Sequence, residues 1–118
     1  MKNACIYKLT NSKSNKIYIG STCQRVLTDR LWRHCSDSMK PEQYNCRLYK
    51  HIRQLGQFEF DIESVLRPKV SSKLELRLYE QAVMDLVPPE RLLNDRRAVS
   101  LKQMRRQKLT LPAVDVRI

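Results

Sequence analysis

Two tyrosines, an arginine and a histidine stand at spacings that could place them around one reaction site. Tyr7 and Tyr18 fall on two short runs of β-branched and aromatic residues, and Arg30 and His34 lie four residues apart in a segment with helical periodicity. Residues four apart share one side of a helix, so the guanidinium and the imidazole should stack together at the edge of the apolar stripe. Phenols and imidazoles can move protons, and a guanidinium binds phosphates or carboxylates through its fork of N–H groups.

One carboxylate and one amide later in the chain could complete such a site. Glu80 lies at the margin of the apolar arc of a predicted helix over 72–86, and Asn94 follows a proline-containing turn. A glutamate on a mostly apolar helix either pairs with a buried cation, such as Arg30, or holds a metal ion. Asn94 either supports the site through its amide or serves as an ordinary turn residue.

A β-hairpin is needed to bring the tyrosines together. Residues 4–10 and 16–21 read as two strands joined by a polar turn. Symmetric closure of that turn would place Tyr7 opposite Tyr18, and directly opposed residues share one face of a sheet. This expectation depends on the register, because a slip of one residue would send the two phenols to opposite faces.

The rest of the pattern predicts the elements that position these residues. Helical periodicity, alternation and capping signals give helices over 26–37, 44–55 and 72–86, a strand over 58–62, and a basic helix around 99–108. Ser72 and Glu75 have the spacing of a capping box, and Gly56 stands where a helix C′ glycine belongs. We therefore predict an α+β fold, a three-stranded and mostly antiparallel sheet packed by helices.

The chain order is strand, strand, helix, helix, strand, helix, followed by the basic helix. A chain of 118 residues suits one compact domain. We place that domain at 1–98 and regard 99–118 as a basic helical extension and tail. The tail is a candidate for docking a partner or for dimerisation.

Net charge gives the strongest global signal about partners. The chain carries +11 at pH 7 with a pI near 9.9. Residues 1–57 hold 11 Lys and Arg against 3 Asp and Glu, residues 58–90 hold 4 against 7, and residues 91–108 hold 7 against 1. Two basic blocks around an acidic one favour a polyanionic partner such as nucleic acid, with a smaller place where carboxylates gather. An anionic membrane surface is the weaker alternative.

Several protein classes are disfavoured by the same composition. No apolar run approaches the length of a membrane span, and the N-terminus lacks the apolar region of a signal peptide, so we expect an intracellular protein, in the cytoplasm or a nucleus. The four cysteines form no CxxC pair, which disfavours both a disulfide scaffold and a zinc site.

The ordered set of these motifs resembles the GIY-YIG nuclease family over about residues 3–98. Cys5-Ile6-Tyr7 and Tyr18-Ile19-Gly20 stand where the two halves of the family's signature would lie, followed by the Arg-x-x-x-His helix, the Phe-rich strand, the Glu80-Gln81 helix and Asn94. One departure is Cys5, which occupies the position of the first glycine of the signature.

This resemblance implies a metal-dependent endonuclease that hydrolyses phosphodiester bonds in DNA. Its catalytic residues would be Tyr7, Tyr18, Arg30, His34, Glu80 and Asn94. Glu80 would bind Mg²⁺ or Mn²⁺, Arg30 would grip the scissile phosphate, and a tyrosine would take the proton of the attacking water, with Tyr7 ahead of Tyr18 and His34. A nicking or structure-directed enzyme with weak sequence preference is expected, because the chain holds little beyond this core.

Double-stranded or branched DNA is the expected partner, as in repair or recombination, with a targeting protein or a homodimer as further options. Phosphate contacts are expected from a group of basic residues, namely Arg47, Lys50, Arg53, Arg96, Arg97, Arg105 and Arg106. Two alternatives stay open: a nucleic-acid-binding module of the same fold that has lost catalysis, and a nuclease that acts on RNA.

Overall fold

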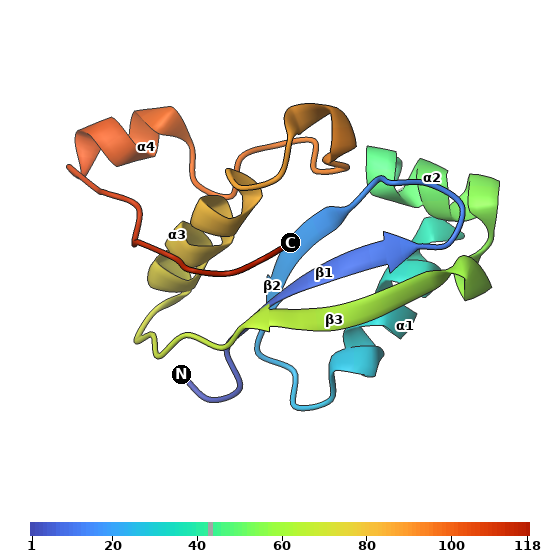
Figure 1. Cartoon of the computed structure of the whole chain (residues 1–118), viewed down its shortest axis with the longest axis horizontal. Coiled ribbons are helices and arrows are strands. Elements are labelled where there is room, and N and C mark those ends of the chain that lie inside the picture. The colour runs from blue at the N-terminus through green and yellow to red at the C-terminus, as the bar shows by residue number, and fades with distance from the viewer. Residues whose placement is uncertain (43) are drawn as a thin grey trace.

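The protein is described by a computed structural model that covers residues 1–42 and 44–118. Figure 1 shows a small sheet flanked by helices, with the C-terminal tail running back over the molecule. In chain order the elements are β1 Cys5–Asn11, β2 Tyr18–Thr22, α1 Leu27–Ser38, α2 Arg47–Leu55, η1 Gln57–Glu59, β3 Phe60–Leu66, α3 Lys73–Met84, η2 Pro89–Arg91 and α4 Leu101–Arg106.

The three strands form one antiparallel sheet in the order β2-β1-β3. This confirms the predicted α+β class and the order of strands and helices. Side chains of the central strand β1 pack into two different hydrophobic cores, because successive side chains of a strand point to opposite faces of the sheet. Ile6 packs in a cluster with Leu76 and Val83 of α3, whereas Tyr7 and Leu9 pack in a second cluster with residues of α1 and α2.

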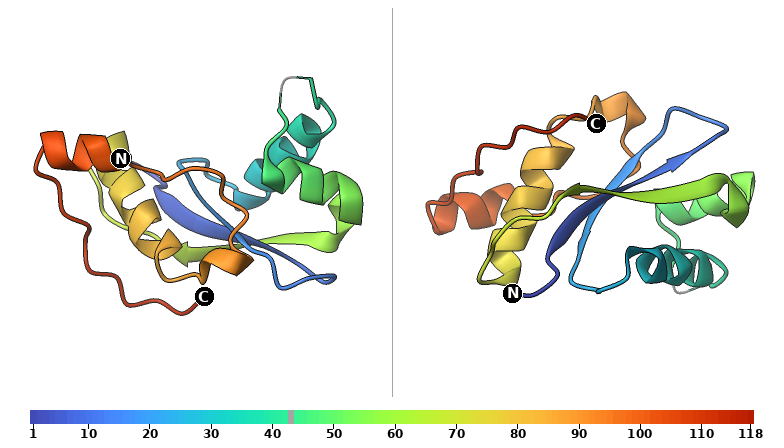
Figure 2. Two further views of the ribbon diagram at one scale, coloured as in Figure 1. Left: turned by 90° about the horizontal axis from the view of Figure 1, so that it is seen from above. Right: turned by 60° about the horizontal axis from the view of Figure 1, so that its bottom comes forward.

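Figure 2 shows the same division in space, with α1 and α2 gathered toward one end of the sheet and α3 with the tail toward the other. The first cluster is therefore the core beneath α3, and the second is the core beneath α1 and α2. The β2 edge of the sheet lies where these two halves meet, since α3 packs on β2 and the second core includes Tyr18.

The hairpin register differs from the predicted one by two residues. Tyr7 stands opposite Gly20, and Tyr18 stands opposite Leu9. The loop between the strands is longer than symmetric closure at the polar turn would make it. Because side chains alternate with a period of two, a shift of two residues preserves the face, and both phenols still lie on the α1/α2 side. Their ring centroids are 6.2 Å apart, so they are diagonal neighbours rather than a directly opposed pair.

Phe58 is not part of the third strand, contrary to the prediction. It lies in η1, where its side chain is 84% exposed, and β3 starts only at Phe60. Gly56, with φ of 99°, ends α2 as expected, and the following turn of 3₁₀ helix uses residues that alternation had assigned to a strand. The second helix also begins later than predicted, at Arg47 instead of residue 44.

Helix α3 begins with half of the predicted capping box. The Ser72 hydroxyl accepts the backbone N–H of Glu75 at 3.1 Å. The Glu75 carboxylate does not return to Ser72, however, and instead accepts the backbone N–H and the hydroxyl of Ser71. The helix ends at Met84, two residues before the predicted end, and Leu86 is exposed.

Residues beyond α3 run back along the sheet and place Asn94. After η2, the backbone N–H of Ile17 donates to the Arg91 carbonyl, and the backbone N–H of Leu93 donates to the Ile17 carbonyl, both at 2.8 Å. This short parallel bridge lies just before β2. It brings the next residue, Asn94, beside Ile19, on the edge of the sheet that α3 also contacts.

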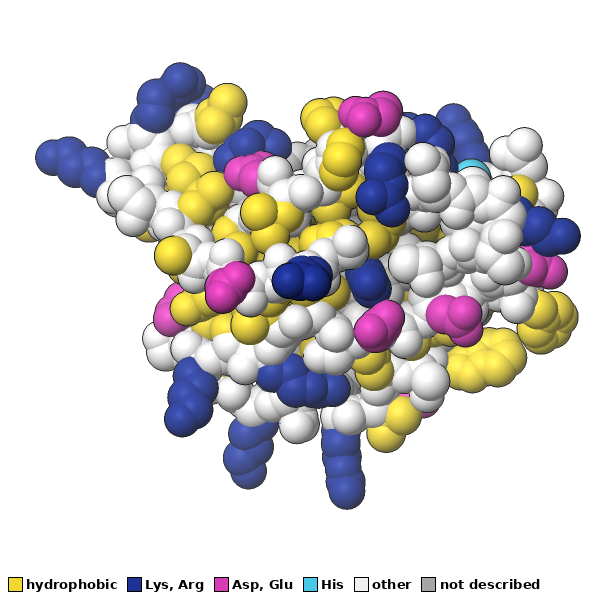
Figure 3. All heavy atoms as spheres, in the orientation of Figure 1, with side chains coloured by type: hydrophobic (Ala, Val, Ile, Leu, Met, Phe, Trp, Pro, Cys, Tyr) yellow, Lys and Arg dark blue, Asp and Glu magenta, His cyan; other side chains and the backbone are white. Residues whose placement is uncertain are grey.

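The basic C-terminal helix is shorter than predicted, spanning Leu101–Arg106 with Ser100 as its N-cap. The tail after it is neither helix nor strand. Its alternate residues Val114, Val116 and Ile118 pack against the core beneath α3, as the path of the tail in Figure 1 suggests. In Figure 3, apolar side chains show through the middle of this face, with most lysines and arginines around its margin. Among the described residues, no helix has both the length and the apolar character to cross a membrane.

Candidate active site

Tyr7, Arg30 and His34 form one hydrogen-bonded cluster between the sheet and α1. The Tyr7 hydroxyl lies 2.6 Å from His34 Nε2, and Arg30 Nε donates to the same hydroxyl at 3.2 Å. Tyr7 is fully buried and His34 nearly so. Arg30 and His34 share one side of α1, as the sequence predicted, and both contact Tyr7 of β1.

A fourth member of the cluster, Tyr49, was not identified from the sequence. It lies on α2, and its hydroxyl is 3.0 Å from His34 Nδ1, so the imidazole is held between two phenols. The sequence offered one weak signal: Tyr49 follows buried Leu48 and lies three residues before buried Ile52, which puts it near the inner side of α2. That position is equally common for packing, so only the tertiary contact distinguishes it.

Hydrogen-bond directions in this cluster follow from donor and acceptor counts. Arg30 only donates, so the Tyr7 oxygen accepts from it. Among the hydrogen bonds of the described residues, the Tyr7 hydroxyl proton then has one acceptor, His34 Nε2. A neutral imidazole that accepts at Nε2 carries its proton at Nδ1 and donates it to Tyr49. The chain of donors therefore runs from Arg30 through Tyr7 and His34 to Tyr49.

Burial favours the neutral forms of these groups, and the Arg30 charge adds to this effect only at His34. Burial, with a smaller effect from Arg30, lowers the pKa of His34 to about 3. Burial raises the pKa of Tyr7 to about 12, although the nearby Arg30 guanidinium acts in the opposite direction. Burial also raises the pKa of Tyr18. A tyrosine so far from ionising at neutral pH can accept a proton only if it passes its own proton onward at the same time.

Glu80 lies on α3 across the β2 edge from this cluster. One carboxylate oxygen accepts the Ser21 hydroxyl at 2.5 Å, and burial raises the pKa of the carboxyl. Within residues 1–42 and 44–118, no Lys or Arg nitrogen comes within 4.0 Å of it. The alternative of a buried ion pair with Arg30 therefore finds no support in the described contacts.

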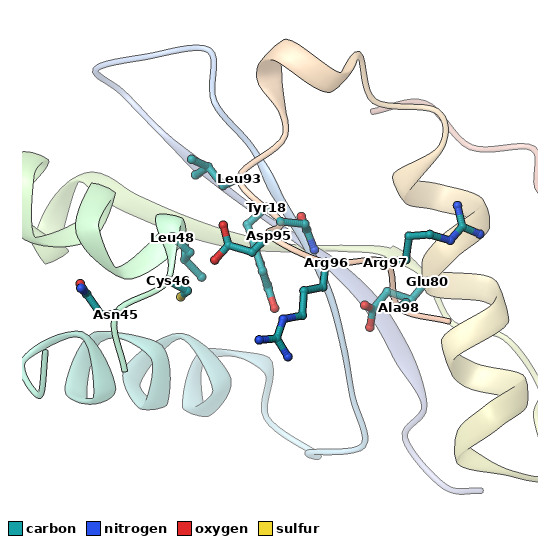
Figure 4. A pocket seen from close by; sticks show the side chains of 11 residues that line it. Tyr18, Asn45, Cys46, Leu48, Glu80, Leu93, Asp95, Arg96, Arg97 and Ala98 are labelled. Atoms are coloured by element: carbon teal, nitrogen blue, oxygen red, sulfur yellow. The ribbon is translucent and has the colours of Figure 1, made fainter. Parts of the chain in front are cut away.

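A cavity of about 450 Å³ has both Tyr18 and Glu80 in its wall. Figure 4 shows Tyr18 from β2, Glu80 from α3 and Arg96 from the following loop extending toward the same space. Asn94 and Cys46 also line this cavity, but Tyr7, Arg30 and His34 do not. The structure thus brings three of the six predicted catalytic residues to the cavity wall and sets the other three in the cluster beside Tyr18, whose ring centroid is 5.4 Å from that of His34.

The chemistry of Glu80 fits a hard divalent cation. Its oxygens face a cavity with room for water, and its charge lies in an environment that disfavours an unaccompanied carboxylate. Mg²⁺ and Mn²⁺ are commonly bound through one or two carboxylates, with water and phosphate oxygens as the other ligands. Among the described residues, no group of three or more His, Cys, Asp or Glu side chains is arranged to hold a metal ion, so Glu80 would act as a single protein ligand.

Asn94 supports the cavity wall through its amide. Its Oδ1 accepts the backbone N–H of Ile19 at 3.0 Å, and its Nδ2 donates to the Ile19 carbonyl at 2.7 Å. This pair of bonds satisfies both backbone groups of an edge residue, as a neighbouring strand would. Asn94 is itself held by Arg47, which donates to its carbonyl and to the Asp95 carboxylate.

Several predicted phosphate contacts have other partners. Arg47 binds Asp95 and Asn94, Arg53 donates to the Ser38 carbonyl and to Asn45, and Arg97 donates to the Val99 carbonyl. The other four basic side chains make no hydrogen bond or ion pair with another described residue, and they are Lys50, Arg96, Arg105 and Arg106. Of the seven, only Arg96 and Arg97 line the cavity.

Comparison with known proteins gives a similarity to a viral protein. Over 81 residues, 69% of this chain, the sequence is 32% identical to the MSV199 domain-containing protein 146R of Invertebrate iridescent virus 6. The match takes in 32% of that protein, so this chain spans about a third of its length. The name of the viral protein states a domain and no activity. No protein-family model matches the chain, and no solved structure matches it.

Proposed function

We propose that this chain is a metal-dependent endonuclease of the GIY-YIG type that hydrolyses phosphodiester bonds in DNA. The observation that carries the proposal is the placement of Glu80, Tyr18 and Asn94 on one cavity, with the buried Tyr7–His34 pair directly beside it. A carboxylate for a hard cation and a proton relay are the two groups that such hydrolysis requires. The high positive charge of the chain agrees with a polyanionic substrate.

In the proposed reaction, Tyr7 is the base. A water oxygen attacks phosphorus, its proton passes to the Tyr7 oxygen, and the Tyr7 proton passes to His34 Nε2. Tyr18 has no hydrogen bond to an onward acceptor among the described residues, so it is better suited to orient water or phosphate at the cavity wall. The P–O bond to the leaving sugar oxygen breaks as the new bond forms.

Arg30 connects substrate binding to this relay. Its Nε now covers the Tyr7 hydroxyl, which no solvent reaches. When the Arg30 guanidinium turns to bind a phosphate through its N–H groups, its Nε moves away from the Tyr7 hydroxyl. The hydroxyl then becomes accessible to the attacking water. A Mg²⁺ or Mn²⁺ ion held by Glu80 would stabilise the negative charge on the leaving oxygen.

The proposal is tested by cleavage of supercoiled plasmid with Mg²⁺ or Mn²⁺, beside an EDTA control and the Glu80→Gln variant. Gln keeps the shape and the Ser21 hydrogen bond while removing the charge, so the folded state should survive, as a thermal melt would verify. We expect metal-dependent nicking by the wild type and none by the variant. If folded wild type leaves plasmid, branched DNA and RNA intact yet retards DNA, a binding module without catalysis replaces the nuclease.

A further inference from the structure

A second groove opens near Glu80 and shares no lining residue with the main cavity. It has a volume of about 260 Å³ and lies between the end of β2 and the N-terminal half of α3. Ser21, Thr22 and Cys23 form one wall, and Lys73 and Arg77 belong to the other. Thr22 and Leu76, which also lines the groove, are buried, whereas both basic side chains are exposed.

The groove is positively charged and has no acidic lining residue. Lys73 and Arg77 are four residues apart, so they extend from the same side of α3. In the described part of the chain neither forms an ion pair. The one acid in this first turn, Glu75, accepts hydrogen bonds from Ser71 at the helix start and forms no ion pair with either basic residue.

Ser21 joins this groove to the candidate active site. It lines the groove, and its hydroxyl donates to Glu80, which lines the main cavity. Lys73 and Glu80 are seven residues apart, two helical turns, and so lie on one side of α3 with about 10 Å between them along the axis.

We propose that this groove binds the phosphate backbone of the cut strand, on the opposite side of the scissile phosphate from Arg96. The inference rests on the proposed nuclease function and adds the path of the substrate. The strand enters beside Arg96 in the main cavity, passes Glu80 and Ser21, and leaves between β2 and α3 over Arg77 and Lys73. Such contacts position the strand and carry no sequence information.

Equilibrium binding to a 30-base-pair duplex, followed by fluorescence anisotropy in EDTA over a series of salt concentrations, tests this path. The variant Lys73→Ala/Arg77→Ala should bind at least about fivefold more weakly, and its slope of log affinity against log salt should be shallower by about two. The matched control is Arg67→Ala/Lys69→Ala, which also removes one Arg and one Lys but from a different surface. The control should bind DNA more tightly than Lys73→Ala/Arg77→Ala and should have a steeper salt dependence than that variant. Thermal melts should show that both variants are folded.

The outcomes separate this inference from the proposed function. If the wild type cuts DNA with metal while Lys73→Ala/Arg77→Ala binds no differently from the control, the groove is not on the substrate path and the nuclease proposal stands. If nothing cuts but the groove variant alone loses affinity and slope, the chain binds nucleic acid through this groove without being a nuclease. Weaker binding together with reduced cutting at low DNA concentration is the result we expect.

Discussion

Gly20 lies directly against the ring of Tyr7, the residue that stands opposite it on the neighbouring strand. A Cβ placed on Gly20 would come within 2.4 Å of both Cζ and the hydroxyl oxygen of Tyr7. This contact explains physically why a glycine follows Tyr18-Ile19: the phenol needs the empty space above the glycine to reach His34. The backbone of Gly20 needs no unusual conformation, so the requirement is one of space.

Gly20→Ala should therefore act through Tyr7. We expect a loss of unfolding free energy of about 1–3 kcal/mol from overpacking, and a fall in DNA cleavage because the hydroxyl leaves His34. Chemical denaturation gives the stability and plasmid nicking gives the activity. In a Tyr7→Leu background, which removes the hydroxyl and shortens the side chain, Gly20→Ala should cost less. Additive costs in this double-mutant cycle would show that the alanine acts elsewhere.

Tyr49→Phe should slow turnover without unfolding the protein. Removing the hydroxyl leaves the His34 Nδ1–H without its acceptor, so the imidazole no longer favours the form that accepts from Tyr7. We expect kcat to fall about tenfold with KM little changed. This fall in kcat is smaller than the one expected when the proposed base, Tyr7, is removed. Tyr44→Phe is the matched control, because Tyr44 packs edge-to-face on Tyr49 but is partly exposed. Equal rates for the two variants would remove Tyr49 from the relay.

The buried neutral His34 should make the protein sensitive to acid. Its folded pKa of about 3 lies below the ordinary value of 6.5, so below pH 6.5 the unfolded chain binds one more proton at this residue. Stability contributed by the neutral imidazole is present above pH 6.5 and is lost as the pH falls toward 3. Between pH 7 and pH 4 this amounts to on the order of 3 kcal/mol.

Urea denaturation of wild type and His34→Gln at several pH values checks this linkage. The variant removes the titrating group, so the stability difference between the two proteins should shrink steadily from pH 7 to pH 4. A difference that stays constant over this range would mean that His34 has the same pKa in the folded and the unfolded chain. If the difference instead grew as the pH fell, the folded protein would bind the second proton of His34 more readily than the unfolded chain. The relay would then run in the other direction.

Arg47 and Arg96 should respond differently to substitution by alanine. Arg47 binds Asp95 and the Asn94 carbonyl at an exposed position, so Arg47→Ala should lower stability by about 0.5–1 kcal/mol and hardly change the salt dependence of DNA binding. Arg96 lines the cavity without a partner among the described residues, so Arg96→Ala should reduce the salt slope by about one and leave the melting temperature unchanged. If Arg47→Ala instead reduced the salt slope of DNA binding and left stability unchanged, Arg47 would be a phosphate contact after all.

Local patterns in the sequence were sufficient to predict most of the helices and strands. Alternation and helical spacing depend on neighbours a few residues away, so they predicted the hairpin, α1, α3 and the pairing of Arg30 with His34 on one helix side. The same reasoning misjudged Phe58, because an exposed turn of 3₁₀ helix and a strand can carry the same alternating residues. It also misjudged the register of the hairpin. The residue pattern of a hairpin indicates which face of the sheet each side chain occupies, but it indicates less well which residue lies opposite on the other strand.

What only the tertiary structure decided is which groups meet. Tyr49 reaches His34 because α2 packs beside α1, and Glu80 reaches Ser21 because α3 packs on β2, and neither contact has a local signal. The division of the predicted residues into a buried cluster and a cavity wall has the same origin. The sequence by itself determined the elements and the sign of the charge, because these depend on residue type and short-range spacing. Burial, proton affinities and the partners of Arg47 depend on contacts between distant segments, and those exist only in the folded chain.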